Sequence, residues 1–400
     1  MTVNVSKSGS NLREQLSELN RPVGSHGSQL MKSANTAESF SLVRAGRKNL
    51  IINGSCMVDQ RNSGSAVSSG YGVDRTHVEG FYGAGTGTAQ QVSDAPKGLF
   101  KSLRITVTGP DTSLSSTDFY TLRHIIEGQN IAHLGFGTNN AKTVTLSFWV
   151  KSSISGIFCC SLGNGTNNKT MPREYHIDNP NKWEYKTLTF APAITGTWGT
   201  DNGRGFSVRW CMGVGSTRRG DADVYNGNES HGTINQTNLF ATNGATFQIT
   251  GMQLEEGNAA TPFEQLSYGE DLALCQRYFW RQYGGTYEYS PGPTNGCGTL
   301  GQGTHHVTMR SKPTMSNNCS GNPKGSSLSG DTTVGVWTWY KQNSGYDSGA
   351  SSYQTVGNWN YSPTKIGWHG GSYNFRPSDT SGTTAIQLGD NTYIQATIEM

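Results

Sequence analysis

Short apolar or alternating runs, separated by turn residues, recur through residues 49–262 and limit the fold more than any other feature of the sequence. Each run has the length of a strand, and Gly, Asn, Asp, Ser and Thr fill the gaps between runs. The runs are Leu50–Ile52, Leu103–Val107, Thr143–Val150, Gly156–Cys160, Tyr185–Phe190, Phe206–Met212 and Thr246–Leu254. At least seven strands over about 210 residues predict a jelly-roll β-sandwich.

The composition agrees with a mainly β protein. Glycine contributes 52 of 400 residues and charged residues only 15%, so tight turns are common and long solvated helices are not favoured. The net charge of +3 argues against a nucleic-acid-binding protein, which needs a strongly basic face. No apolar run of 18 residues is present, so we expect no insertion into a membrane.

Residues 248–285 join a strand to a helix. Phe247–Leu254 alternates apolar and polar residues, and Pro262 then blocks continuation of the strand. Ser267 and Glu270 have the spacing of a capping box, which predicts a helix that ends at Gly284-Gly285. We therefore expect a sandwich at residues 49–262 and a smaller C-terminal β domain at 263–400, which opens with this linker helix.

Residues 1–48 differ from the rest of the chain. They hold seven Lys or Arg against three Glu, about +4, which leaves −1 for the remainder. Two short helices are predicted, but helices of this length are unstable alone in water and need a partner. The residues expected to make that contact are apolar or basic: Leu12, Leu16, Leu19, Arg13, Arg21, Phe40, Arg44 and Arg47. We expect a helical or extended arm that docks on an acidic partner surface.

Four stretches in order carry a resemblance to a known family. They are AGRKNLIINGSCMVDQRNSG at 45–64, LRHIIEGQNIAHL with VTLSFWVKSS at 122–153, QTNLFATNGATFQITG at 236–251, and GMQLEEGNAATPFEQLSYGEDLALCQRYF at 251–279. Together they resemble phage tail-fibre and virion structural proteins with a carbohydrate-binding-module-like β-sandwich. The resemblance implies an N-terminal virion-anchoring arm, other virion proteins as partners, and a homotrimer.

The cysteines suggest where the chain is made. Seven are present, with no CxxC pair and no metal-ligand spacing, which is typical of free thiols from a reducing cytosol. No apolar segment of a signal peptide follows Met1. The expectation is a virion protein made in the host cytoplasm.

No arrangement for catalysis is found, and we expect no enzyme and no cofactor. Glu255 and Glu256 are adjacent on a predicted strand, so they point to opposite faces and cannot form the carboxyl pair of a glycosidase. The Gly-x-Ser-x-Gly signature of a nucleophile elbow is absent. Asp221–Glu229 resembles half of a calcium loop but departs from the pattern at Tyr225, so a solvated turn is favoured over a structural calcium site.

Aromatic residues concentrate towards the C-terminal end among Asn, Ser and Gly, a composition typical of binding loops. Sugar C–H faces can stack on such rings while hydroxyls meet the polar groups. The candidates for glycan binding are Trp337, Trp339, Tyr340, Tyr346, Tyr353, Trp359, Tyr361, Trp368, His369 and Tyr373. The alternative is that Trp337, Trp339 and Trp368 fill the core of a small domain.

These features together predict a structural protein of a phage virion, a tail fibre or surface fibre. Its arm would attach to the particle and its C-terminal domain would bind host surface glycan. One alternative is a capsid decoration or head-fibre protein, and a second is a glycan depolymerase.

Overall fold

The computed structural model describes residues 47–290 and 384–399 and, between them, 299–300, 303–304, 307–311, 314–317, 338–341, 359–361 and 365–368. The chain divides into two compact units, residues 1–49 and 50–400, and the elements below belong to the second. The predicted N-terminal helices, with Leu12, Leu16, Leu19, Arg13, Arg21, Phe40 and Arg44, lie outside the described residues. Arg47 is the first described residue and is exposed.

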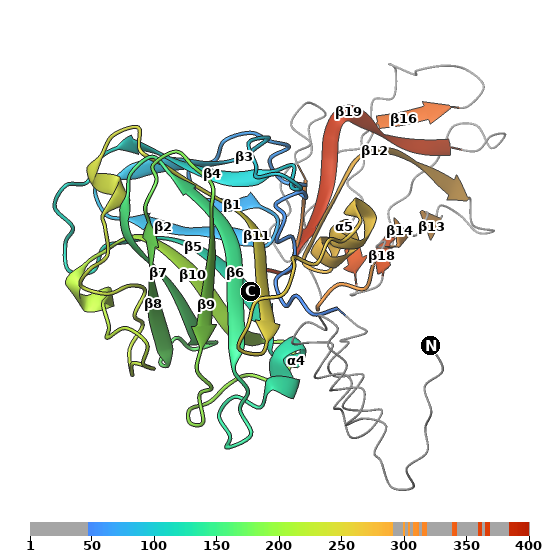
Figure 1. The fold of residues 1–400 in the computed structure, drawn as a ribbon. Helices are drawn as coiled ribbons and strands as arrows, with labels where there is room; N and C mark the ends of the chain where they lie inside the picture. The colour runs from blue at the N-terminus through green and yellow to red at the C-terminus, as the bar shows by residue number, and fades with distance from the viewer. Residues whose placement is uncertain are drawn as a thin grey trace, which may run out of the picture. The chain divides into compact units, whose positions relative to one another are not determined.

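Two antiparallel sheets form the sandwich, and Figure 1 shows them as facing layers. Sheet A has the order β3-β4-β11-β6-β9, and sheet B has the order β1-β2-β5-β10-β7-β8. The sheet A strands are β3 (Thr86–Val92), β4 (Ser102–Gly109), β6 (Val144–Ser152), β9 (Glu184–Phe190) and β11 (Thr246–Glu256). The sheet B strands are β1 (Gly70–Val73), β2 (Thr76–Tyr82), β5 (Phe119–Glu127), β7 (Gly156–Asn164), β8 (Thr170–Ile177) and β10 (Arg204–Val214). The predicted jelly-roll sandwich is confirmed.

The core lies between the sheets and follows the alternation of each strand. Leu146, Phe148 and Val150 of β6 face it from sheet A, and Phe206, Val208, Trp210 and Met212 of β10 face it from sheet B. Intervening residues of these strands point to the outer faces, where polar side chains and single rings lie. Both outer faces can therefore carry binding residues without disturbing the core.

Some strand predictions were wrong or incomplete. Leu50–Ile52 is not a strand but begins a run of turns, with Ile51 buried in the core. Strands β1, β2, β3 and β8 carry too few apolar residues to be predicted: β3 buries only Gly87 and Ala89. β8 contains Pro172, which is tolerated because β8 is an edge strand.

Helix α5 (Tyr268–Gln276) begins with the predicted capping box, in which Ser267 and Glu270 each bond the other's backbone N–H. Its predicted end at Gly284-Gly285 was wrong. The helix stops at Gln276, and β12 (Phe279–Ser290) follows almost at once and pairs with β19 (Thr384–Thr397). Aromatic residues are frequent in strands, and the run Tyr278–Trp280 therefore favours a strand over a longer helix. All three of its rings are buried.

The remaining elements are short. The helices are α4 (Gly128–Ile131) and the 3-10 turns Ala132–Leu134, Ser216–Arg218 and Leu239–Ala241. The C-terminal strands are β13 (Thr299–Leu300), β14 (Gly303–Thr304), β15 (Thr314–Asn317), β16 (Thr338–Lys341), β17 (Trp359–Tyr361) and β18 (Lys365–Trp368). They form one sheet around β12 and β19 and a second of β14-β18-β17, which confirms the smaller C-terminal β region. Within the described chain, no helix has both the length and the apolar character needed to cross a membrane.

Ion pairs join the C-terminal sheet to the sandwich close to the end of β19. Arg61 pairs with Asp74 at 2.9 Å and with Glu399 at 2.8 Å, and Arg75 pairs with the second oxygen of Glu399. The guanidinium of Arg75 also lies 3.5 Å from the ring centroid of Tyr278. Glu399 follows β19 by two residues, so this network joins the end of the C-terminal sheet to the buried Arg75 of the sandwich.

Candidate functional site

Two aromatic rings lie side by side on the outer face of sheet A. Trp149 of β6 is directly opposite Tyr185 of β9, and their ring centroids are 5.3 Å apart at an angle of 52°. Tyr185 is 43% exposed although its neighbours Glu184 and Lys186 are half-buried. Together with Lys151, Trp183 and Asp94, these rings form what we call the sheet A strip.

The other three residues of the sheet A strip, Lys151, Trp183 and Asp94, contact one another through polar groups. The indole N–H of Trp183 donates to a carboxylate oxygen of Asp94 at 3.2 Å, and Lys151 pairs with the other oxygen. The ammonium of Lys151 lies 5.1 Å from the Trp183 ring centroid. Burial acts to raise the pKa of Asp94, but the bonds from Lys151 and Trp183 bring it below its ordinary value. The Asp94 carboxylate is therefore a charged acceptor at neutral pH.

A glycine in β11 makes room for Trp149. Gly251 has φ +62°, and the register between β11 and β6 shifts between Thr250 and Gln253. A Cβ at Gly251 would lie 3.1 Å from Trp149 Cδ1 and 3.0 Å from Leu99 Cδ1. The bulge and the missing side chain thus let the indole lie against the sheet beside Tyr185.

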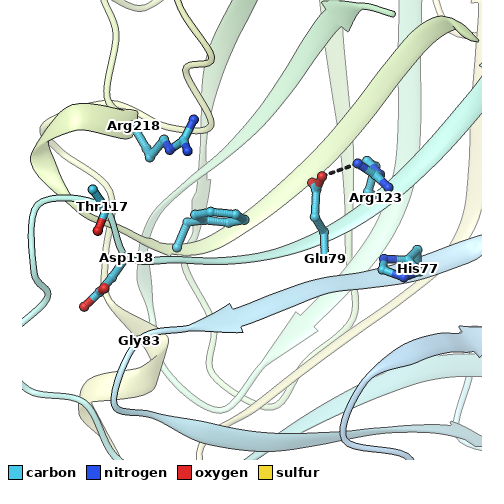
Figure 2. A pocket seen from close by; sticks show the side chains of 8 residues that line it. His77, Glu79, Gly83, Thr117, Asp118, Arg123 and Arg218 are labelled. Atoms are coloured by element: carbon cyan, nitrogen blue, oxygen red, sulfur yellow. Dashed lines mark hydrogen bonds and ion pairs between the residues drawn. The ribbon is translucent and has the colours of Figure 1, made fainter. Parts of the chain in front are cut away.

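A pocket of about 570 Å³ opens on sheet B, shown in Figure 2. Its lining comes from β2, β5 and the segment after β10: His77, Glu79, Gly83, Thr117, Asp118, Phe119, Arg123 and Arg218. In Figure 2 the carboxylate of Glu79 points toward Arg123, and Arg218 lies across the pocket from them.

A network of charged side chains lies next to this pocket, and Glu79, Arg123 and Arg218 belong both to the network and to the lining. Arg123 and Arg209 are directly opposite each other on β5 and β10, and Glu79 bonds to both of them. Arg209 is fully buried, and its Nη2 lies 3.2 Å from Glu229, which also pairs with Arg218. Burial acts to raise the pKa of Glu79, but Arg209 and Arg123 lower it below the ordinary value. Alternating signs thus allow two arginines to sit side by side in the sheet.

Glu229 gives this network a measurable pH dependence. The pKa of Glu229 is lowered to about 2, first by His231, whose Nε2 lies 3.5 Å from a Glu229 oxygen, and then by the charges of Arg209 and Arg218, against the effect of burial. A depressed pKa stabilises the fold above the unfolded-state value near 4.5, and this contribution is lost as the pH falls toward 2.

We predict that Glu229→Gln destabilises the protein at pH 6 but has a shrinking effect below pH 4.5. The difference in urea midpoint between variant and parent measures this contribution, because other titrating groups cancel in the comparison. A difference that stays constant between pH 6 and pH 2.5 would contradict the assignment.

The predicted glycan-binding residues lie largely beyond what the structure describes. Trp337, Tyr346, Tyr353, His369 and Tyr373 are outside the described residues. For five others only the backbone is described: Trp339 and Tyr340 in β16, Trp359 and Tyr361 in β17, and Trp368 in β18. Trp359 and Trp368 are directly opposite each other in the β17–β18 pair. Binding by this region stays a prediction.

The segment that resembles a calcium loop forms hydrogen bonds within itself and an ion pair with the side chain of Arg173. The Asn226 side chain donates to the carbonyl of Asp221 and accepts its N–H, both at 3.1 Å. Asp223 lies 2.8 Å from Arg173, and Glu229 belongs to the network under the pocket. No group of three or more His, Cys, Asp or Glu in the described part of the chain is placed to hold a metal ion. These oxygens fit a hydrogen-bonded turn.

The cysteines are as predicted where the structure describes them. Five are free and buried: Cys56, Cys159, Cys160, Cys211 and Cys275. Burial raises the pKa of Cys159 to about 11 and that of Cys56 to about 12, so these thiols are not reactive nucleophiles at neutral pH. Cys297 and Cys319 lie outside the described residues.

Comparison with known proteins finds similarity in structure only. No family model and no curated protein matches the sequence. Among solved structures, the enzymatically active domain of bacteriophage CBA120 tailspike protein 4 matches 52% of this chain at 11% identity and a TM-score of 0.29. This chain covers about a fifth, 21%, of that chain.

Two carbohydrate-binding modules match over their whole length. TmCBM61, solved in complex with β-1,4-galactotriose, covers 53% of this chain and is matched over 100% of its own, at 9% identity and a TM-score of 0.26. The family 11 module of the cellulosomal cellulase Lic26A-Cel5E of Clostridium thermocellum covers 50% and is matched over 99%, at 10% identity and a TM-score of 0.25. Similarity at this level identifies neither a family nor a ligand for this chain.

Proposed function

We propose that this chain is a structural protein of a phage virion, a tail fibre or surface fibre, whose sandwich binds glycan on the host surface. The observation that carries the proposal is the sheet A strip, in which two rings lie beside a charged acceptor and a charged donor. The resemblance of residues 45–285 to virion structural proteins supports the virion role.

Binding at the sheet A strip needs no chemical step. The C–H face of a sugar ring packs on Tyr185 and Trp149, and its hydroxyls donate to Asp94 or accept from Lys151. The rings are already held by β6 and β9, so little side-chain entropy is lost on binding. We therefore propose adhesion as the activity, with no catalytic step.

The other regions of the chain would attach the protein to the virion and to further copies of itself. Residues 1–48 would attach the protein to other virion proteins, and the C-terminal aromatics would add a second contact with glycan. Three copies would form a homotrimer, in which partner chains support the arm. Light scattering of the full chain is expected to give three times the 43.2 kDa chain mass, and a monomer at micromolar concentration would contradict the trimer.

We predict that Tyr185→Ala weakens glycan binding about tenfold, because an exposed ring that stacks on a ligand is a typical hot spot. Affinity of the full chain for immobilised neutral oligosaccharides measures the effect, with reducing ends assayed in the same samples and none expected. Tyr268→Ala is the matched control, since Tyr268 is a 54% exposed tyrosine on α5, which contributes no residue to the strip. Equal affinities of the two variants would overturn the assignment to sheet A.

A further inference from the structure

The pocket on sheet B is independent of the sheet A strip. In β5, Tyr120 and Leu122 face the core, so Phe119 and Arg123 point to the opposite, outer side. The pocket therefore opens away from sheet A, and its lining shares no residue with the strip. It is therefore a separate site with its own chemistry.

Hydrogen-bond donors exceed acceptors in this pocket. Both oxygens of Glu79 are already occupied, one by Arg123 and Arg209 and the other by Arg209 and Thr121. By contrast, the buried Nε–H of Arg123 has no hydrogen-bond partner among the described residues, and neither has the buried Nδ1 of His77, which donates or accepts according to its tautomer. Buried polar atoms are usually paired, so the unpaired Arg123 donor beside a pocket indicates an absent acceptor.

The position of the guanidinium groups agrees with an anionic acceptor. Arg123, Arg209 and Arg218 face Glu79 and Glu229, so the network holds one positive charge more than its own carboxylates balance, and only the Asp118 carboxylate brings the total to zero. Asp118 also lines the pocket, but its carboxylate accepts the backbone N–H of Ser115 at 2.7 Å and in Figure 2 points away from the guanidinium groups.

Size and apolar surface narrow the ligand class. A volume of about 570 Å³ lies within the usual range for small-molecule sites and suits one or two sugar rings. Phe119 contributes an apolar ring to the wall of the pocket, although only 9% of the residue is exposed, and the Arg218 guanidinium lies 5.5 Å from its centroid. A ligand with both an apolar face and a carboxylate would satisfy both groups.

From these contacts we propose that the sheet B pocket binds an acidic sugar, a saccharide unit with a carboxylate. The carboxylate lies against Arg123 and Arg218, and the ring packs on Phe119. Bidentate pairing of a guanidinium with a carboxylate explains why arginines rather than lysines line the pocket.

The test is calorimetric titration of the full chain with glucuronate, with glucose and with inorganic phosphate. Glucose has the same ring with a neutral hydroxymethyl group, so it isolates the carboxylate. The titration uses the full chain with Tyr185→Ala, which removes stacking at the sheet A strip. Saturable glucuronate binding, with at least about tenfold weaker binding of glucose, is the expected result. Tighter binding of phosphate than of glucuronate would overturn the assignment to a carboxylate.

Two variants locate the binding. Arg218→Gln and Arg123→Gln are each expected to raise the dissociation constant for glucuronate at least about tenfold, through loss of a charge-assisted hydrogen bond. Arg218 is 32% exposed, so its substitution preserves the fold even where that of Arg123 does not. Arg104→Gln on the outer face of sheet A is the matched control and should bind glucuronate normally. Unchanged binding in folded Arg218→Gln and Arg123→Gln would overturn the proposal.

Discussion

Glu79→Gln is expected to lower the free energy of unfolding by about 3–5 kcal/mol, the usual cost of leaving a buried charge without its partner. The Glu79 carboxylate lies between Arg123 and Arg209, and Arg209 has only 1% of its side chain exposed. A neutral amide would leave these two arginines directly opposite each other in adjacent strands with less compensation. Urea unfolding at pH 7 measures the loss.

The matched control for this prediction is Glu256→Gln. Glu256 is 33% exposed and pairs with Lys142, which is 46% exposed, at 3.1 Å. Solvent-exposed pairs of this kind contribute only about 0–1 kcal/mol. If Glu79→Gln costs no more than Glu256→Gln, the network under the pocket does not stabilise the sandwich.

Glu399→Gln is expected to cost about 3 kcal/mol, and its effect should concentrate where β12 and β19 meet the sandwich. Glu399 is 10% exposed and is shared by Arg61 and Arg75. Burial acts to raise its pKa, but the charges of Arg75 and Arg61 lower it below the ordinary value, so the carboxylate is ionised at neutral pH. The amide would leave the buried Arg75 without its carboxylate.

Hydrogen exchange distinguishes local from global loss in Glu399→Gln. Backbone amides of Phe279–Arg281, which pair with Gln395–Thr397, should exchange faster, while those of β10 in the centre of sheet B should change little under native conditions. Uniform acceleration through β10 would show that the network stabilises the whole unit and not this junction. The size of the effect in β12 therefore measures how firmly the C-terminal sheet is fastened.

The sandwich could be predicted because its central strands have a clear apolar periodicity in the sequence. β10 and β11 run through the middle of their sheets and are apolar at alternate positions, so periodicity alone identifies them. The edge strands β1 and β3 bury few side chains, and each is held by one strand close to it in the chain, β1 by β2 and β3 by β4. Propensity cannot detect strands that are held by neighbours rather than by their own composition.

The candidate sites were missed for a related reason. Trp149 shares the polar face of β6 with Ser147 and Lys151, a signal visible in the alternation of residues 144–152. Its partner Tyr185 follows 36 positions later, and only the pairing of β6 with β9 brings the rings together. Arg209 within an apolar strand was a similar signal of a buried charge, but nothing local indicates that Glu79 is its partner.

The most direct test of glycan binding by the sandwich is a crystal structure of the complete chain with a neutral oligosaccharide bound. We expect a sugar ring packed on Tyr185 and Trp149, with hydroxyls within hydrogen-bond distance of Asp94 and Lys151. A sugar bound elsewhere, with the sheet A strip empty at saturating ligand, would contradict it.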